Sequence, residues 1–197
     1  MLQAACQLPQ SPEDYLAGES FAEVRHEYVD GEVYAMSGAR KRHNLISLNL
    51  ARALHTHLRG TPCQVFTRDV KIHVAWDWHE RYYYPDVVVT CEADDTDPDV
   101  VEKPRLIIEV LSESTERQDR ADKFYAYRRL DSLQEYVLIA QEVLRVEVYR
   151  RDTNWDLEVY EAAEAEIELR SVGLSLTVAE AYEGLTEPPR DSSSPCL

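Results

Sequence analysis

Two carboxylates lie within segments that are otherwise mainly apolar. Asp86 follows Pro85 and opens the run 87–89, and Glu109 interrupts the run 105–111. Short runs rich in β-branched residues and bounded by turn residues are typical of strands buried on both faces of a sheet. A carboxylate in such a strand is costly to bury unless it is paired, protonated or bound to a cation. These two positions therefore predict a functional site.

The residue types favour a divalent cation, because carboxylate oxygens suit Mg²⁺ or Mn²⁺. Adjacent strands can bring Asp86 and Glu109 to one ion that keeps several positions for water and phosphate. Such an ion can activate a water, neutralise the charge of the transition state and stabilise the leaving oxygen. Hydrolysis of a phosphodiester is therefore a chemistry that these residues could support.

Several blocks around the two carboxylates occur in the order that one known family shows. The blocks are 84–89, then 108–112 continuing to Ser114-Thr115, then 119–123 with Tyr127. From about Tyr15 to the mid-180s, the chain resembles the Uma2 family of endonucleases (the DUF820 domain), a branch of the PD-(D/E)XK nuclease superfamily. The resemblance implies a restriction-endonuclease-like fold and cleavage of DNA that depends on Mg²⁺ or Mn²⁺.

The resemblance also implies a ligand set. It assigns Asp86 and Glu109 as the metal-binding carboxylates, and the backbone carbonyl of Val110 as the group that completes the inner shell. Without the family, Asp86 could be an ordinary turn aspartate after a proline. Glu109 could be a buried glutamate paired with a lysine or an arginine.

The chain departs from the superfamily at the catalytic lysine. The position two beyond Glu109 is Leu111, so the usual strand lysine is missing. The resemblance to Uma2 offers Lys123 instead, reaching back from the following helix to orient the attacking water or neutralise charge. The alternative is a surface ion pair between Lys123 and Asp119, which contributes about 0.2–0.5 kcal/mol.

Two more residues match places in the family pattern, an acid in a hairpin and a histidine at the start of the first long helix. Glu32 would add a metal ligand or bind its water, and His43 would contact phosphate or act as an acid or base near neutral pH. Against these roles, a hairpin glutamate is usually solvated, and a first-turn histidine is usually neither ligand nor base.

The elements that must position these residues follow from periodicity and turn residues. In the hairpin around Asp30-Gly31, Val29 should lie opposite Glu32 and Glu27 opposite Tyr34, so that the two acids share a face. Helices are expected at 11–18, 42–58, 115–130 and from Thr177, and strands at 25–36 (the hairpin), 64–76, 82–90, 105–111 and 135–169 (four strands).

This order of elements predicts a single α/β domain, with a central mixed sheet flanked by helices and extended by an antiparallel meander. A chain of 197 residues is long enough to bury most of one core. We expect residues 1–10 to be a disordered lead, 11–186 the domain and 187–197 a disordered tail.

The net charge opposes binding to a polyanion. It is −16, with a pI near 4.7, whereas proteins that bind nucleic acids usually carry a basic footprint. Candidate basic patches are 40–43 and the later helical set, although charge runs are often solvated faces. The later set consists of Arg117, Arg120, Lys123, Arg128 and Arg129.

Two other function classes stay open. A nuclease fold that has lost catalysis could serve as an interaction module for nucleic acid or protein, and the missing strand lysine and the negative charge favour this reading. A glycosidase could also use a carboxylate pair. Tyr82-Tyr83-Tyr84 could stack on a sugar, but tyrosines in strands are more often ordinary packing.

Cysteine spacing and hydropathy bound the cellular context. The chain has no Cys-x-x-Cys and no basic segment followed by an apolar one at its N-terminus, and its apolar runs are too short to span a bilayer. We therefore expect neither a zinc cluster nor a disulfide framework, and a cytoplasmic protein without a membrane partner. Uncovered strand edges favour a homodimer. The cysteines are Cys6, Cys63, Cys91 and Cys196.

Overall fold

The computed structural model of the chain describes residues 9–36, 38, 40–113, 115–186 and 189. The predicted lead and tail lie almost wholly outside this range, as does Ser114 of the family-like blocks. The helices are α1 (Pro12–Glu19), α2 (Lys41–His57), α3 (Glu116–Gln118), the π-helix η1 (Asp119–Lys123), α4 (Phe124–Tyr127) and α5 (Val178–Ala181).

Among the described residues, thirteen strands form three sheets. The strands are β1 (His26–Val29), β2 (Glu32–Ala35), β3 (Gln64–Thr67), β4 (Lys71–Trp76), β5 (His79–Tyr83), β6 (Val87–Thr90), β7 (Val100–Val101), β8 (Pro104–Val110), β9 (Glu135–Ile139), β10 (Val146–Arg150), β11 (Leu157–Tyr160), β12 (Glu166–Leu169) and β13 (Leu174–Thr177).

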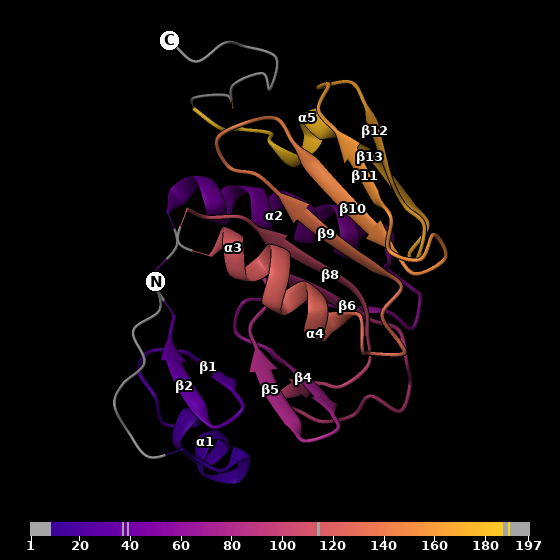
Figure 1. The fold of residues 1–197 in the computed structure, drawn as a ribbon. Helices are drawn as coiled ribbons and strands as arrows, with labels where there is room; N and C mark the ends of the chain where they lie inside the picture. The colour runs from indigo at the N-terminus through magenta and orange to yellow at the C-terminus, as the bar shows by residue number, and fades with distance from the viewer. Residues whose placement is uncertain (1–8, 37, 39, 114, 187–188, 190–197) are drawn as a thin grey trace.

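The largest sheet has six strands in the order β11-β10-β9-β8-β6-β3. Its strands pair antiparallel except for β8 and β9, which are parallel. Parallel neighbours need a crossover connection, and α3, η1 and α4 supply it between β8 and β9 (Figure 1). The mixed α/β class that the sequence predicts is confirmed.

A second sheet has the order β2-β1-β5-β4-β7. The sequence predicts single strands at 64–76 and 82–90, but each is divided between the two sheets, as β3 and β4 and as β5 and β6. The chain turns at 68–70 in the first segment. In the second it turns next to Pro85, which has no N–H to donate to a ladder. Asp86 consequently lies where the chain passes from one sheet to the other.

The core lies on both faces of the six-stranded sheet. On one face, α2 places Ile46, Leu50 and Leu54 against strands β6 and β8. On the other face, Tyr127 of α4 and Tyr83 of β5 belong to a second apolar cluster. This double burial explains the continuous apolar runs of β6 and β8. Figure 1 shows the crossover helices and α2 on opposite faces of this sheet.

The register of the first hairpin agrees with the prediction, since Val29 pairs with Glu32 and Glu27 with Tyr34. The predicted meander is right for β9, β10 and β11 but wrong for its fourth strand. Strand β12 pairs with β13 in a separate two-stranded sheet. The local pattern identifies a strand, but it does not identify the partner.

Cys63 and Cys91 form a disulfide, so the expectation of no disulfide framework is wrong for these two cysteines. Gln64 of β3 pairs with Thr90 of β6, so the two cysteines flank a paired position at the ends of neighbouring strands. Their 28-residue separation in the sequence gives no sign of this proximity.

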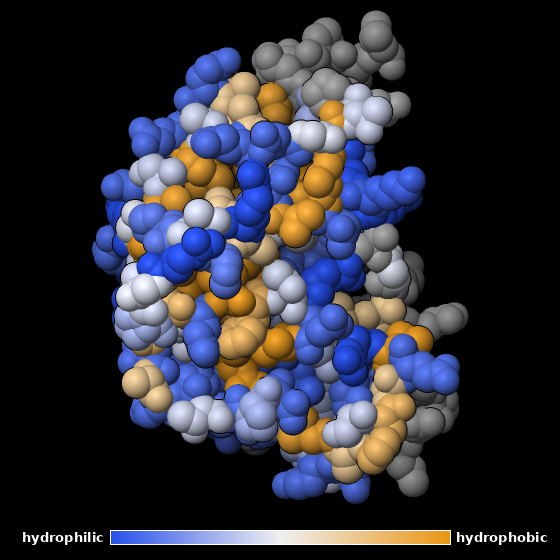
Figure 2. All heavy atoms as spheres, turned by 180° about the vertical axis from the view of Figure 1, so that it is seen from behind, coloured by the Kyte–Doolittle hydropathy of each residue, from blue (hydrophilic) through white to orange (hydrophobic). Residues whose placement is uncertain are grey.

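The exterior is largely polar. The face opposite to that of Figure 1 is covered mainly by hydrophilic residues, with apolar residues in patches between them (Figure 2). Within the described parts of the chain, no helix has the length and hydropathy to cross a bilayer.

Candidate active site

A cleft of about 1400 Å³ lies where the two larger sheets meet η1 and the start of α2. Its lining comes from β1, α2, β8, η1 and β10, and it includes Asp86, Glu109, Lys123 and His43. Four of the five side chains that the sequence predicts as catalytic therefore share one cavity.

Asp86 is 7% exposed and is aimed at the neighbouring strand β8. Its Oδ2 accepts a hydrogen bond from the backbone N–H of Val110 at 2.8 Å. The same oxygen lies 3.1 Å from His43 Nε2, and Oδ1 lies 3.6 Å from Arg68 Nε. Asp86 is thus tied to the strand that carries Glu109, which an ordinary turn aspartate does not require.

Glu109 lies in β8 and is 4% exposed. Its Oε1 accepts hydrogen bonds from Lys123 Nζ at 3.1 Å and from the hydroxyl of Tyr127 at 2.9 Å. Burial raises the pKa of the Glu109 carboxyl well above its usual range. Lys123 opposes this rise in pKa, and the negative charges of three neighbouring carboxylates add to it.

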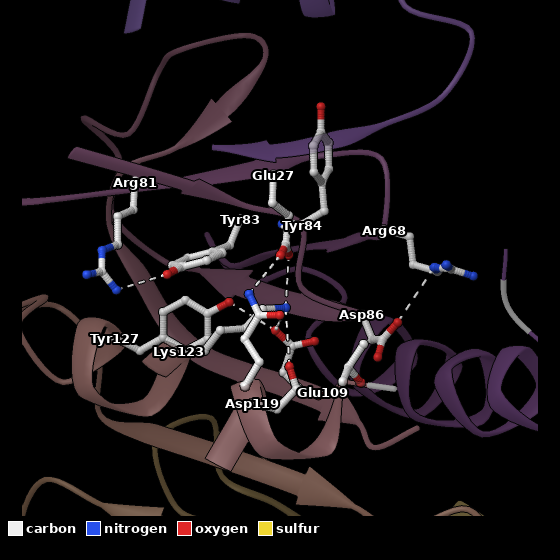
Figure 3. Close-up of polar contacts among 12 residues, drawn as sticks. Glu27, Arg68, Arg81, Tyr83, Tyr84, Asp86, Glu109, Asp119, Lys123 and Tyr127 are labelled. Atoms are coloured by element: carbon white, nitrogen blue, oxygen red, sulfur yellow. Dashed lines mark hydrogen bonds and ion pairs between the residues drawn. The ribbon is translucent and has the colours of Figure 1, made fainter. Parts of the chain in front are cut away.

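Lys123 is buried among carboxylates from three elements (Figure 3). Its Nζ lies 2.9 Å from Glu27 Oε1, 3.1 Å from Glu109 Oε1 and 3.3 Å from Asp119 Oδ1. Burial lowers the pKa of Lys123, but attraction to Glu109 and Glu27 outweighs burial and leaves the pKa well above its ordinary value. The Asp119–Lys123 pair exists, but it is not the solvated surface pair of the alternative reading.

The segment that presents Lys123 is a π-helix, where the sequence predicts a regular α-helix. Asp119 and Lys123 open and close η1, and both are buried. The hydroxyl of Tyr136, on β9, donates to the backbone carbonyl of Asp119 at 2.9 Å. π-Helical turns are rare and often occur at functional sites, because the wider turn redirects side chains.

Glu27 belongs to the cluster, although the sequence analysis did not select it. Besides Lys123, its Oε1 accepts from the N–H of Tyr84 at 3.4 Å, and its Oε2 accepts from Gln118 Nε2 at 3.5 Å. Strand β1 lies between β2 and β5 in its sheet. A carboxylate in a central strand is the signal that could have identified this residue.

The structure does not bring Glu32 into the cluster. Its side chain is exposed on edge strand β2 and accepts a hydrogen bond from the hydroxyl of Tyr34. His43, by contrast, lies in the first turn of α2, lines the cleft and contacts Asp86. Among the described residues, His43 Nδ1 is buried without a hydrogen-bond partner.

Basic side chains from both predicted patches surround the cleft. Arg40 and Arg120, one from each patch, line the cleft. Arg68 and Arg145, which belong to neither patch, line it as well. Arg120 and Arg145 both bind Glu147 and hold it in place. Burial alone would raise the pKa of Glu147, but hydrogen bonds from these two arginines leave it below its ordinary value.

The cluster carries more negative than positive charge. Three buried carboxyl groups surround the buried Lys123, namely Glu27, Glu109 and Asp119. A fourth, Asp86, is buried nearby against His43 and Arg68. Within the described ranges, no three side chains of His, Cys, Asp or Glu are arranged to hold a metal ion by themselves. The oxygen donors that could hold a cation here are Asp86, Glu109 and the carbonyl of Val110.

Comparisons with known proteins identify the family. Residues 12–179 match the model of the Uma2 family, whose description is "Putative restriction endonuclease". Two uncharacterized proteins of Synechocystis sp. (strain ATCC 27184 / PCC 6803 / Kazusa) are similar to the chain. One, slr1290, is 38% identical over 178 residues, which are 89% of this chain and 92% of the relative. The other, sll1609, is 37% identical over 160 residues, which are 79% and 89%.

A solved structure has the same fold. It is a "putative nuclease belonging to DUF820" from Anabaena variabilis ATCC 29413, with a TM-score of 0.68 at 17% identity, and the likeness covers 82% of this chain and 91% of that one. The nuclease-like fold that the sequence resemblance implies is confirmed. On the match of the family model over residues 12–179, the chain belongs to the Uma2 family.

Proposed function

We propose that this protein is an endonuclease that hydrolyses DNA phosphodiester bonds with Mg²⁺ or Mn²⁺. The observation that carries the proposal is the meeting of Asp86, Glu109 and Lys123 in one cleft, from three segments of the chain. A buried carboxylate needs a partner, and here Glu27, Glu109 and Asp119 share one lysine while Asp86 lies beside them in the same cleft. That excess of negative charge fits a cation.

Asp86 and Glu109 would hold the ion, with the carbonyl of Val110 completing the protein ligands. Mg²⁺ is usually bound through one or two carboxylates and keeps several waters, so the donor set suits it. When bound, the ion supplies an activated water and neutralises charge on the phosphate. Asp86 is pre-oriented for this role by the N–H of Val110, and Glu109 by the hydroxyl of Tyr127.

Lys123 would position the attacking water. Its raised pKa keeps the ammonium charged at neutral pH, and three carboxylates fix it at the base of the cleft. His43, beside Asp86, would contact the phosphate or exchange a proton with it. Glu32 has no part in this proposal, because its side chain is exposed and lies outside the cluster.

The arginines of the cleft would bind DNA phosphates despite the negative net charge of the protein. Arg40 is exposed and Arg68 is half-buried, and both line the cavity. Arginine binds phosphate well because its planar guanidinium can donate two parallel hydrogen bonds. Local contacts of this kind would hold a DNA backbone on a protein whose remaining surface repels it.

An inactive interaction module is the second candidate. The specific observation in its favour is that Lys123 is already occupied by three carboxylates. On this reading the lysine replaces the metal, as a structural counter-ion. A homodimer fits either candidate, since Leu157 and Val159 are exposed on β11, which is an open edge of the six-stranded sheet.

The deciding experiment is cleavage of supercoiled, linear and single-stranded DNA with Mg²⁺ or Mn²⁺. Low salt is needed because phosphate binding weakens steeply with added salt. Wild type should cut, and Asp86→Asn, Glu109→Gln and Lys123→Ala should lose activity while remaining folded by circular dichroism. Asp122→Asn is the matched control, because Asp122 lies in the same π-helix but is exposed.

Other outcomes would support one part of the proposal and contradict another. Cleavage by Lys123→Ala alone would leave the carboxylate pair in place and remove the lysine from the mechanism. If no DNA form is cut by wild type with either metal, the interaction module becomes the better reading. Calorimetric titration with Mn²⁺ would then show whether Asp86 and Glu109 bind a cation at all.

A further inference from the structure

The β4–β5 hairpin lies below α4 in the view of Figure 1. A surface of aromatic rings and arginines forms where Trp76 of this hairpin contacts Tyr125 of α4. We call it the aromatic platform. Trp78 is 77% exposed and Tyr125 is 45% exposed, although large aromatic side chains are usually well buried. The described lining of the catalytic cleft includes no member of the platform. The platform consists of Trp76, Trp78, His79, Tyr125, Arg128 and Arg129.

The rings form one continuous series. Trp78 lies 3.7 Å from His79 between ring centroids, and His79 stacks on Trp76 at 4.4 Å. Trp76 meets Tyr125 of α4 edge-on at 6.0 Å. Two segments that are distant in the sequence thus present adjacent ring surfaces, with Trp78 at the exposed end.

The hairpin turn projects Trp78 outward. Trp76 pairs with His79, so Asp77 and Trp78 are the two turn residues. Asp77 adopts a φ of 52°, in the left-handed region that such tight turns require. The tryptophan is therefore held at the tip of a short, paired hairpin rather than on a long loop.

Two exposed arginines flank the rings. The guanidinium of Arg129 lies 4.8 Å from the Tyr125 ring centroid, and that of Arg128 lies 5.8 Å from it. In the part of the chain that the structure describes, neither arginine forms an ion pair with a carboxylate, and both are exposed. The cleft arginines Arg120 and Arg145, by contrast, are held by Glu147.

We infer that the aromatic platform binds unpaired bases of single-stranded nucleic acid. Ring faces stack on any base, and flanking guanidinium groups attract the phosphates between bases. A duplex keeps its bases stacked on one another and offers none to such a surface. Stacking also depends little on net charge, so it gives an acidic protein a way to hold a polyanion.

This inference rests on the proposed function, because it names the substrate class as nucleic acid with an unpaired stretch. The platform is nevertheless separate from the metal-binding carboxylates. Arg81, which lies 4.8 Å from the Trp76 ring centroid, also donates to the hydroxyl of Tyr83 at 3.2 Å. In Figure 3, Arg81 lies at the opposite end of the buried cluster from Asp86 and Arg68. Binding at the platform can therefore be measured without cleavage.

The test is binding of a labelled oligothymidine of about 16 nucleotides and of a duplex of equal length, in EDTA, by fluorescence anisotropy. Wild type should prefer the single strand, and its tryptophan fluorescence should fall on binding. Trp78→Ala should weaken single-strand binding by about fivefold or more, the smallest loss expected for one base stack. Arg128→Ala/Arg129→Ala should weaken binding and reduce its salt dependence.

Matched variants define the controls. Phe21→Ala removes an aromatic side chain that is 90% exposed elsewhere, and Arg52→Ala/Arg59→Ala removes the same charge from α2 and the residues after it. Both should bind like wild type. Asp77→Asn should bind more tightly, because it removes the acid in the turn and asparagine tolerates the same backbone.

Equal affinity for duplex and single strand, or wild-type affinity in Trp78→Ala, would overturn the inference. The two proposals can also fail separately. A protein that binds the single strand through Trp78 but never cuts keeps the platform and loses the endonuclease. A protein that cuts in the cleft with Trp78→Ala unchanged in binding keeps the endonuclease and loses the platform.

Discussion

Lys123 Nζ lies 3.1 Å from Glu109 Oε1, although the two residues are 14 positions apart in the sequence. The side chain two positions beyond Glu109 points to the same side of an extended chain, and the usual strand lysine of the superfamily is missing from that position. That place holds Leu111, which is 5% exposed and packs in the apolar core with Ile107. The helix after the strand thus supplies the positive charge that position 111 lacks.

Removing this charge should destabilise the fold. Lys123→Ala leaves the buried carboxylates of Glu27 and Asp119 uncompensated and removes a hydrogen-bond partner of Glu109, and breaking a buried pair in this way costs about 3–5 kcal/mol. Urea unfolding at neutral pH should show a loss of that size. Lys103→Ala, which removes a partly exposed lysine whose ion pair with Asp94 lies at the surface, should leave the free energy of unfolding nearly unchanged. Equal effects of both substitutions would contradict the buried cluster.

The raised pKa of Glu109 should make stability fall as pH rises. The folded chain keeps this proton where the unfolded chain, with the ordinary pKa of 4.5, has lost it. The contribution is fully present below the unfolded pKa and is lost as pH rises through the folded one. Glu109→Gln removes it, so the variant should gain stability relative to wild type as pH rises above 4.5, the ordinary pKa of the carboxyl. A difference in stability between variant and wild type that stays constant with pH would show that folding does not raise the pKa of Glu109.

The two glutamates of the first hairpin should behave differently. Glu27→Gln removes one of the carboxylates that hold Lys123, so cleavage should fall by about tenfold or more, as for a lost charge-assisted hydrogen bond. Glu32→Gln should leave cleavage within twofold of wild type, because Glu32 is exposed. Rates at saturating metal would compare the two variants. A larger loss of cleavage in Glu32→Gln than in Glu27→Gln would instead assign a role in cleavage to Glu32.

Reduction of the disulfide should lower stability without changing the site. A cross-link that closes a loop of this length contributes about 2–4 kcal/mol, mainly by restricting the unfolded chain. Urea unfolding of wild type should shift to lower concentration when dithiothreitol is added. Cys63→Ser/Cys91→Ser should unfold like the reduced protein, with or without dithiothreitol. If the urea unfolding curve of wild type does not shift when dithiothreitol is added, the disulfide does not stabilise the fold.

The sequence identifies the features whose cause is local. Glu109 stands out because a charge among aliphatic neighbours needs a partner, and the partners are Lys123 and Tyr127. The Asp30-Gly31 turn predicts the hairpin register because the two left-handed residues admit one tight geometry, and both have positive φ. Helix α2 follows from its apolar stripe and begins within one residue of the predicted position.

Features that depend on distant contacts could not be predicted in this way. The alternation of 64–76 is the same whether its halves pair with one sheet or two, and the pairing decides that Asp86 lies between them. Glu27 and Glu32 share a strand face, but the cover provided by β5 buries only one of them. Cys63 and Cys91 meet only because β3 lies beside β6.

The π-helix affects how this site can be found in relatives. A π-turn holds more residues than an α-turn, so a relative with a regular helix between Asp119 and Lys123 would have one residue fewer there. The wider turn absorbs the extra residue, so such a relative could still present a lysine to Glu109 from the equivalent place in its helix. An alignment without a gap inside this helix would then place the residue equivalent to Lys123 one position away.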